Sequence, residues 1–569
     1  MPTSAAMLAR LEALRGDFSD PAIEEKLRWL QALADRPPRR AAALRRWHSA
    51  LAYARAFPDR EAIAAHARDE LARFHQHIAH LPAAERGRLH DSGIAGTTHF
   101  CRYSFDVARW LTKHAPGAAA IDWAELTELD AFDNLMGKLV EPAEEQAFLE
   151  GGFTPRSWFD FVRGKSGDTD LDWLVREIAA APRGREAIID QYDAIELPVG
   201  WRLMDGQWSI TRNVAPVAQT AIRKSFRKPP ADAPGWIAQP LPGIRRLAPG
   251  AGRRVIDIAI AALAVRQREV YSMNRANPDE VWHAPLGEGV DLAVFGVLPD
   301  ARPVLEGNFG YMLFANGAPI GYGGVSPLFV QGNTGINIFP EYRKSEAAFL
   351  FVQTLRAFHT LFDCRHFIAN PYQFGEGNSE AIGSGAFWFY YRLGFRPTDA
   401  TIRRLAEREA ELLRNDRRHR TAARTLRQLA QGDLVLSLPG ADSREIFSER
   451  WLTTLARGAA ETIRDRAAEN PRSASREIVI QDIARDVSRR LQCGPPPAEP
   501  AVARRAHAQL AIYVAMAERI ERWPAASRRG LADLLRDKGT ADERSYCRRL
   551  ARHARFRKAL ATWCRAADE

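Results

Sequence analysis

The stretch from Gly317 to Pro397 constrains the fold of this chain more than any other part of the sequence. Apolar segments of strand length alternate there with longer segments in which apolar residues recur every three or four positions. The order of elements reads strand, strand, helix, strand, helix. Strands separated by helices require crossover connections and form mixed sheets. We therefore expect an α/β domain in the middle of the chain.

The same patterns place the individual elements of this domain. Strands are predicted at residues 290–298, 309–315, 319–329, 334–339 and 365–370, and helices at 345–362 and 378–393. Asn316-Gly317 is a typical hairpin turn between the second and third strands. A later segment, 433–438, is isolated between helical stretches. We expect it to return to the sheet as the last strand.

The flanking regions indicate an α-rich multidomain protein, and four domains are expected. Residues 1–190 have helical periodicity and form an N-terminal helical domain. Residues 191–253 hold a hairpin across Asp205-Gly206 and a Pro/Gly-rich connector. Residues 254–440 form the α+β domain, a mixed sheet with helices on both faces. Residues 441–569 form an Arg-rich helical C-terminal domain.

The charge of the chain is moderately positive, with 80 Lys and Arg against 70 Asp and Glu in 569 residues. Arg-dense helical segments at 402–427 and 544–565 suggest nucleic-acid binding as one alternative. Acidic residues such as Glu407, Glu409 and Glu411 interrupt the first of these segments and weaken that alternative. The positive charge is better read as a composition bias of the whole chain.

The compartment is predicted from cysteines and apolar runs. The five cysteines are scattered, and none forms a CxxC pair, so we expect no disulfide scaffold and no zinc or other metal site. The first twenty residues carry acidic side chains and no long apolar run, which differs from a secretory signal. No stretch is long enough to span a bilayer, so we expect no membrane partner and a cytoplasmic location.

Two junctions within the α/β domain have the residue types of a ligand site. The first is Pro340-Glu341-Tyr342-Arg343, where a strand leads into a helix. A helix N-terminus binds anions through its unpaired N–H groups and its dipole. Ser345 is placed to cap that helix. The second junction is 389–397, reading FYYRLGFRP, where a helix leads back into a strand.

Together these junctions resemble the acyl-CoA-binding core of the GNAT acetyltransferase superfamily, over about residues 254–440. That family typically has Pro-Glu-Tyr-Arg followed by a Gly-rich turn. This chain has Lys344 and Glu346 at positions where glycine is usual. Glycine lets the backbone approach the pyrophosphate closely. The asparagine that often opens the second helix would fall at Gly383, and Asn370 and Asn378 are the available substitutes.

The resemblance implies roles for specific residues. Tyr390 corresponds to the tyrosine that often protonates the leaving thiolate, and its alternative reading is a core aromatic. Glu376 and Glu380 are candidates to receive or deprotonate an amine, although a solvated loop is the competing reading. The residues implied to bind the co-substrate are Ile338, Phe339, Arg343, Lys344, Ser345, Glu346, Ala347, Ala348, Asn370 and Asn378. The predicted strand 334–339 contains no carboxylate, so no general base is identified.

The resemblance implies a cytoplasmic, bacterial-type N-acyltransferase. Such an enzyme would use acetyl-CoA or another acyl-CoA as co-substrate, without a metal, and transfer the acyl group to a small-molecule or peptide amine by direct attack. The alternative is a catalytically inactive GNAT-like module that serves as a binding or scaffold domain. The sequence leaves the acyl acceptor and the oligomeric state open.

Overall fold

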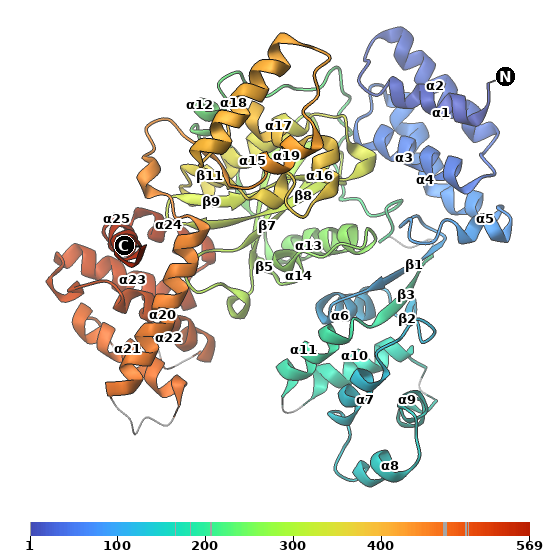
Figure 1. Cartoon of the computed structure of the whole chain (residues 1–569). Helices are drawn as coiled ribbons and strands as arrows, with labels where there is room; N and C mark the ends of the chain where they lie inside the picture. Colours follow the sequence, from blue (N-terminus) through green and yellow to red (C-terminus); the bar gives the residue numbers. More distant parts are fainter. Residues whose placement is uncertain are drawn as a thin grey trace. The chain divides into compact units, whose positions relative to one another are not determined.

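The structure is a computed structural model that describes residues 2–165, 167–181, 184–204, 208–469, 475–494, 498 and 500–568. The chain divides into two compact units, whose elements are labelled in Figure 1. The first unit comprises Met1–Ser225, Arg254–Asn274 and Phe314–Pro319. The second comprises Phe226–Arg253, Arg275–Leu313 and Ile320–Glu569. Residues 254–274, which the sequence placed with the sheet, thus group with the first unit.

The N-terminal part of the first unit is a helical cluster, as the periodicity predicted. Its helices are α1 (Ser4–Ala13), α2 (Asp20–Asp35), α3 (Ala41–Ala56), α4 (Glu61–Ala79) and α5 (Ala83–Gly87). Leu33, Leu44, Trp47 and Phe74 are fully buried where these helices pack. Apolar residues three or four positions apart on each helix supply this core.

The remainder of the first unit contains a small sheet, of which the sequence predicted only the strand that becomes β3. Its elements are β1 (Thr97–Arg102), α6 (Phe105–His114), β2 (Ala119–Ile121), α7 (Leu129–Gly137), α8 (Glu145–Glu150), α9 (Pro155–Arg163), α10 (Asp170–Ala180), α11 (Arg185–Ile195) and β3 (Pro198–Leu203). The strands lie antiparallel in the order β1-β3-β2. The expectation of a purely helical region was wrong here, because these short strands are stabilised by pairing across about 100 residues of sequence.

The expected hairpin around Asp205-Gly206 is also not formed. Its first arm is β3, which pairs with β1 and β2. Residues 208–213, expected as the second arm, form turns. Asp205, Gly206 and Gln207 lie outside the described residues.

A large mixed sheet forms the core of the second unit, so the expectation of a mixed α/β fold is confirmed. Its strands are β4 (Arg245–Arg246), β5 (Ala276–Gly287), β6 (Val290–Val297), β7 (Phe309–Ala315), β8 (Ala318–Leu328), β9 (Gln331–Thr334), β10 (Asn337–Ile338), β11 (His366–Ala369), β12 (Arg396–Pro397) and β13 (Leu434–Ser437). The order is β12-β13-β11-β9-β8-β7-β6-β5-β4, and β10 pairs with β8. The strand predicted at 433–438 does return to the sheet, between β11 and β12.

Helices cover this sheet and follow its strands. They are α12 (Ala233–Ile237), α15 (Ala347–Phe362), α16 (Ser379–Ser384), α17 (Ala386–Arg392), α18 (Ala400–Asn415) and α19 (Ala423–Leu429). Two more helices, α13 (Pro249–Ala264) and α14 (Tyr271–Asn274), precede β5 in the chain and belong largely to the first unit. Figure 1 shows α15, α16, α17 and α19 gathered beside β8, β9 and β11. Phe351 of α15 packs against Tyr390 of α17 and against Phe395. The helix predicted at 378–393 is divided at Gly385, whose φ is 66°.

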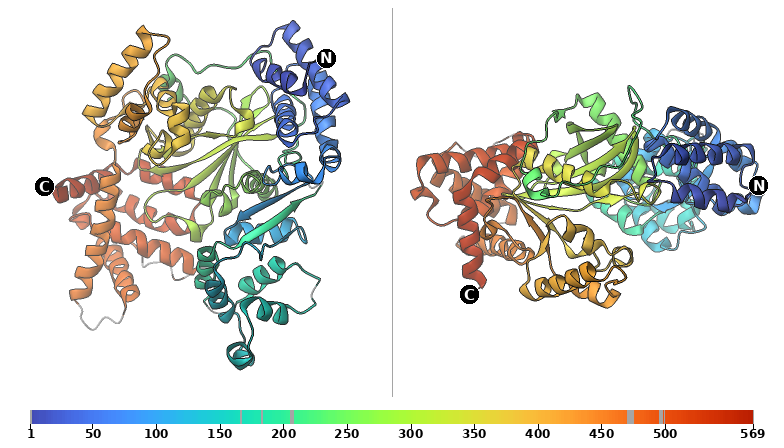
Figure 2. Two further views of the ribbon diagram at one scale, coloured as in Figure 1. Left: turned by 45° about the vertical axis from the view of Figure 1, so that its right-hand side comes forward. Right: turned by 90° about the horizontal axis from the view of Figure 1, so that it is seen from above.

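The C-terminal helices form a bundle that Figure 2 shows in two views. They are α20 (Glu449–Glu469), α21 (Arg476–Leu491), α22 (Ala501–Ala515), α23 (Ala525–Thr540), α24 (Glu543–Arg552) and α25 (Ala554–Asp568). A buried polar network ties this bundle to the sheet. Glu543 pairs with Lys538 at 2.8 Å and with Arg302 at 3.3 Å, and Arg302 also pairs with Glu280 of β5. Within the described residues, no helix combines the length and apolar character needed to cross a membrane.

Candidate functional site

The site forms at the carboxyl end of a parallel strand pair in the second unit. β9 and β11 run parallel, with Ile368 opposite Asn333. Beyond Thr334 the first strand breaks and resumes as β10, which pairs with β8. β11 ends at Ala369. Parallel strands that stop pairing at their carboxyl ends open the edge of the sheet where α/β proteins commonly bind ligands.

The break between β9 and β10 is a fixed feature of this edge. It consists of Gly335 and Ile336. The phenol of Tyr311 donates a hydrogen bond of 2.6 Å to the carbonyl oxygen of Gly335. The side chain of Gln373 lies so close that a Cβ at position 335 would be 2.0 Å from its Oε1. A side chain at position 335 would therefore require the end of the Gln373 side chain to move.

Tyr390 reaches the same break from α17. Its side chain is 2% exposed and is surrounded by Phe351, Phe374 and Phe395. Burial raises the pKa of Tyr390 far above its usual range, and a hydrogen bond with the backbone of Ile336 opposes part of that rise. The phenol therefore keeps its proton at neutral pH, as a general acid must. The core-aromatic reading also holds, because the ring is fully packed.

The N-terminus of α15 presents backbone donors near this edge. The amides of Ala347, Ala348 and Phe349 donate to no partner among the described residues, since the first bond into this helix runs from the Leu350 amide to the Glu346 carbonyl. Ala347 and Ala348 are half-buried and keep the side chains there small. Three unpaired amides and the helix dipole favour an anion at this end.

The turn before α15 adopts a glycine-like backbone without glycine. Lys344 has φ 65°, in the left-handed region that side chains rarely adopt. Ser345 was expected to cap the helix, but its hydroxyl donates to the Tyr342 carbonyl at 2.9 Å. The N-cap residue is instead Glu346, and it makes no side-chain capping bond. The expected cap was wrong because the backbone enters the helix one residue later.

The carboxylate of Glu346 is buried and neutralised. Arg227 donates to it from Nη2 at 2.6 Å, from Nε at 3.0 Å and from its own backbone amide at 3.0 Å. The guanidinium also lies over the ring of Phe349, 4.2 Å from its centre. The negative charge that the sequence placed beside the anion site is thus compensated by a residue 119 positions away.

Arg343 and Glu380 form an exposed ion pair, which joins the turn before α15 to the start of α16. The pair brings together Arg343, predicted to bind the co-substrate, and Glu380, predicted to receive or deprotonate an amine. Exposed pairs of this kind contribute about 0–1 kcal/mol. Glu380 therefore holds the Arg343 side chain only weakly.

Ile338 and Phe339, both predicted to contact the co-substrate, differ in burial. Ile338 is half-buried on β10. Phe339 is 2% exposed and stacks on Tyr322 with 5.4 Å between ring centres. Its amide donates to the Ile320 carbonyl. The side chain of Phe339 therefore belongs to the core, whereas Ile338 lies nearer the surface.

The loop after β11 contains the other candidates. Asn370 is exposed at the end of β11. Asn378 caps α16 by accepting from the Ala381 amide at 3.0 Å, and it donates to the Tyr372 carbonyl at 3.1 Å. The side chain of Asn378 is thus committed to local structure. Glu376 is exposed and lines a cavity of about 470 Å³.

That cavity lies between the loop after β11 and α19. Its lining residues are Gly375, Glu376, Gly377, Asn378, Ser379, Ile382, Arg427, Ala430 and Gln431. Its volume is in the range of small-molecule sites. Close to it, Asp433 directly precedes β13. Burial raises the pKa of Asp433, and the charges of Glu449 and Glu376 raise it further. A carboxylate with a raised pKa is suited to accept a proton.

Four residues of this site were not found from the sequence: Arg227, Tyr311, Gln373 and Asp433. Arg227 lies in the Pro-rich connector, with no local signal linking it to Glu346. Tyr311 is an interior residue of a strand and reads as ordinary core. Asp433 is the first residue of the strand predicted at 433–438. A carboxylate at the edge of a strand was the one sequence signal that could have identified it as a site residue.

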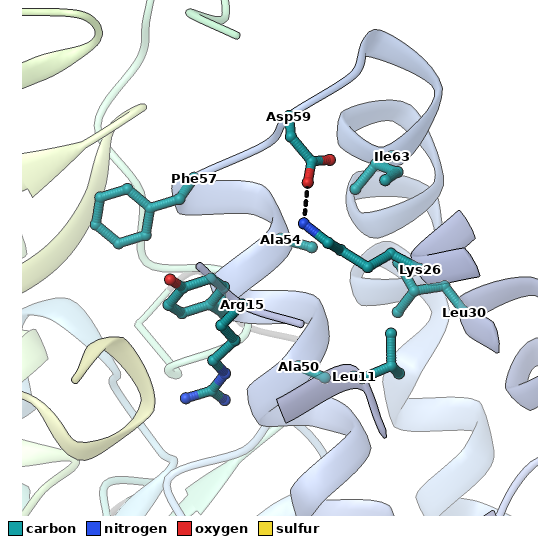
Figure 3. Close-up of a pocket in the computed structure, with 10 residues that line it drawn as sticks. Leu11, Arg15, Lys26, Leu30, Ala50, Ala54, Phe57, Asp59 and Ile63 are labelled. Atoms are coloured by element: carbon teal, nitrogen blue, oxygen red, sulfur yellow. Dashed lines mark hydrogen bonds and ion pairs between the residues drawn. The ribbon is translucent and has the colours of Figure 1, made fainter. Parts of the chain in front are cut away.

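A smaller cavity lies among the N-terminal helices (Figure 3). Its volume is about 40 Å³, and Lys26 forms an ion pair with Asp59 at its edge. Asp59 Oδ1 is buried and has no donor among the described residues. The volume accommodates about three water molecules, one of which would satisfy that oxygen. We therefore regard this cavity as part of the helical core.

No family model, curated protein or solved structure matches this chain. Within the described residues, no group of three or more His, Cys, Asp or Glu side chains is arranged to hold a metal ion.

Proposed function

We propose that the second unit is an acyl-CoA-dependent N-acyltransferase of GNAT-like layout. The observation that carries this proposal is the meeting of three features at one sheet edge. They are the unpaired amides of α15, the glycine break in the strand, and the buried phenol of Tyr390 beside Ile336. An acyl-CoA needs a site for its pyrophosphate, a polar backbone for its thioester carbonyl and an acid for its sulfur.

In the proposed reaction an amine nitrogen attacks the thioester carbonyl carbon in a ternary complex. The carbon–sulfur bond then breaks, and the leaving thiolate takes the phenol proton of Tyr390. The amine loses its proton to a nearby carboxylate. Asp433 is the candidate that best fits this role, since burial and the charges of Glu449 and Glu376 raise its pKa and so strengthen its hold on a proton. The products are an amide and free coenzyme A.

The proposed acceptor site is the 470 Å³ cavity beside Glu376. Glu376 supplies a negative charge that attracts a protonated amine, and it lies near enough to influence Asp433. Glu380, by contrast, is paired with Arg343, so we assign it to the turn before α15 and not to proton transfer.

The alternative function is a scaffold module that keeps this fold without chemistry. Lys344 and Glu346 favour it, because both occupy positions where the resembling enzymes have glycine. Nucleic-acid binding has less support, because arginines of the C-terminal segment are internally compensated. Arg548 and Arg552 pair with Asp363 at 3.3 and 3.0 Å, and Arg549 pairs with Asp537 at 2.6 Å.

A turnover assay tests the proposal. The full chain is incubated with acetyl-CoA and separate pools of amino acids, polyamines, amino sugars and peptides, and free thiol is measured. We expect thiol release that depends on one pool, with an amide product of matching mass. Absence of release with every pool, for acetyl-CoA and for longer acyl-CoAs, would favour the scaffold alternative.

A further inference from the structure

A second sizeable cavity lies in the first unit, away from the residues discussed above. Its volume is about 380 Å³, within the range of small-molecule sites. The lining residues are Arg55, Ala64, Arg68, Ala72, Arg212, Val214, Ala215, Pro216, Val217, Thr220 and Asn316. Three of these are arginines, and none is acidic.

The helical wall is arranged around one of the arginines. Ala64, Arg68 and Ala72 are four residues apart on α4, so they share one face of that helix. The two alanines leave space on either side of Arg68. Within the described part of the chain, Arg68 makes no hydrogen bond or ion pair, and its side chain is exposed. Its guanidinium is therefore available to a ligand.

The other two arginines are held in place by backbone carbonyls. Arg55 donates from Nη1 to Thr211 at 2.7 Å and from Nη2 to Ile210 at 3.4 Å. Arg212 donates from Nη2 to the carbonyl of Ala72. These bonds to backbone carbonyls orient the two guanidinium groups. Each group has further N–H donors in its planar fork.

The opposite wall is also well ordered. Asn316 is 7% exposed, and its side chain bonds to the carbonyls of Ala56 and Ala221 at 3.1 Å and to the amide of Ala221 at 2.8 Å. The Ala215 amide donates to the Gly317 carbonyl at 2.8 Å. These bonds fix the 215–221 segment as a wall, so the cavity is built into the fold of this unit.

We propose that this pocket binds the phosphate group of a phosphorylated small molecule. Arg55, Arg68 and Arg212 would surround the phosphate, since guanidinium groups match its oxygens in paired hydrogen bonds. Three like charges on one pocket repel one another, and a dianion relieves that repulsion. Val214 and Val217 provide apolar surface for the organic part of the ligand. This proposal is independent of the acyl-transfer proposal.

A small molecule fits this pocket better than a nucleic-acid strand. The cavity is a single concavity, whereas a strand is bound along an extended basic groove with aromatic stacking platforms. Among the residues lining the pocket there is no aromatic side chain. A phosphorylated small molecule and a nucleic-acid strand both carry phosphate, so the experiment tests both ligands.

The test is calorimetric titration of the full chain with three small probes, inorganic phosphate, pyrophosphate and adenosine 5′-monophosphate, at fixed ionic strength. A single-stranded oligonucleotide is titrated separately, at several salt concentrations. The variants are Arg68→Ala and, as a matched control, Arg45→Ala, which removes an exposed arginine of α3 outside the pocket. We expect saturable binding that weakens at least tenfold in Arg68→Ala and less than twofold in Arg45→Ala. Both variants add alanine to an exposed helix position, which favours folding.

Four outcomes would overturn the proposal. The first is the absence of saturable binding of any of the three small probes. The second is equal weakening in both variants, which would show a non-specific charge effect. The third is pyrophosphate binding that is lost in Arg343→Ala and kept in Arg68→Ala, because it would place the anion at α15 instead. The fourth is tighter binding of a single-stranded oligonucleotide than of the mononucleotide, with a steep salt dependence. That result would show that the ligand is a nucleic acid and not a small molecule.

Discussion

The guanidinium of Arg227 holds the carboxylate of Glu346 through two hydrogen bonds, Nη2 to Oε1 at 2.6 Å and Nε to Oε2 at 3.0 Å. Glu346 is the N-cap residue of α15, so a negative charge is buried at the end of the helix proposed to receive pyrophosphate. The paired guanidinium cancels that charge. Glu346 therefore need not exclude an anion from this end of the helix.

Removal of this cation is expected to destabilise the second unit. Arg227→Ala leaves the fully buried Glu346 carboxylate without its guanidinium, and such changes cost about 3 kcal/mol. The free energy of unfolding is measured by urea denaturation, with Lys228→Ala, an exposed neighbour, as control. The double variant Arg227→Met, Glu346→Gln should recover most of the loss. A cost below about 1 kcal/mol for Arg227→Ala would show that the pair is not structurally important.

The backbone at Lys344 predicts an unusual substitution pattern. Its φ of 65° strains a residue that has a Cβ, so Lys344→Gly should raise the free energy of unfolding by about 0.5–1 kcal/mol over Lys344→Ala. Both variants lose the same charge, so the difference reports the backbone alone. Denaturant midpoints of the two variants provide the comparison. Equal midpoints would mean that the turn relaxes to another conformation.

Tyr390 is expected to contribute to turnover more than to binding. Tyr390→Phe keeps the packed ring and removes the proton donor, so kcat should fall by about 10²-fold or more with little change in coenzyme A affinity. Tyr391→Phe is the matched control. It removes the same hydroxyl from the next residue along the chain, whose ring packs against the guanidinium of Arg396. Equal kcat values for the two variants would remove Tyr390 from the proposed mechanism and leave it as a core aromatic.

The raised pKa of Asp433 predicts a pH dependence with a definite sign. Turnover needs the deprotonated carboxylate, so kcat/KM should fall as pH drops through this raised pKa. Glu449→Gln removes a charge that raises it, and the acidic limb of the profile should move to lower pH. Glu461→Gln, farther along α20, is the control. An acidic limb that stays in place in Glu449→Gln would identify a different base.

The same group links stability to pH. Because the pKa of Asp433 is higher in the folded than in the unfolded state, the folded chain binds more protons between those two values. The free energy of unfolding contributed by this group therefore falls as pH rises through that window and is constant above it. Glu449→Gln should reduce this fall, which urea denaturation at several pH values would detect.

The sequence predicted those elements whose signals are local. The strand at 309–315 matches β7 residue for residue, because it is an unbroken apolar run that ends at the Asn316-Gly317 turn. β5 was missed, since Asn277, Pro278 and Pro285 interrupt its pattern although the strand pairs with β6 along its length. Pairing supplied by a neighbouring strand outweighed unfavourable local residues.

The candidate site was predicted only in part for the same reason. Arg343 and Tyr390 lie in short motifs that can be read along the chain. Arg227 and Asp433 act on residues distant in sequence, so their roles depend on the tertiary structure. The cap at Ser345 was misplaced because the left-handed backbone at Lys344 delays the start of α15.

Calorimetric titration with coenzyme A and acetyl-CoA tests the central proposal most directly. The compared chains are the original, Arg343→Ala and Glu380→Ala, which remove opposite halves of one ion pair. The account predicts a Kd on the order of micromolar, at least about tenfold weaker binding in Arg343→Ala, and unchanged or tighter binding in Glu380→Ala. No binding at millimolar ligand, or equal weakening in both variants, would contradict a pyrophosphate site at α15 and with it the proposed acyl transfer.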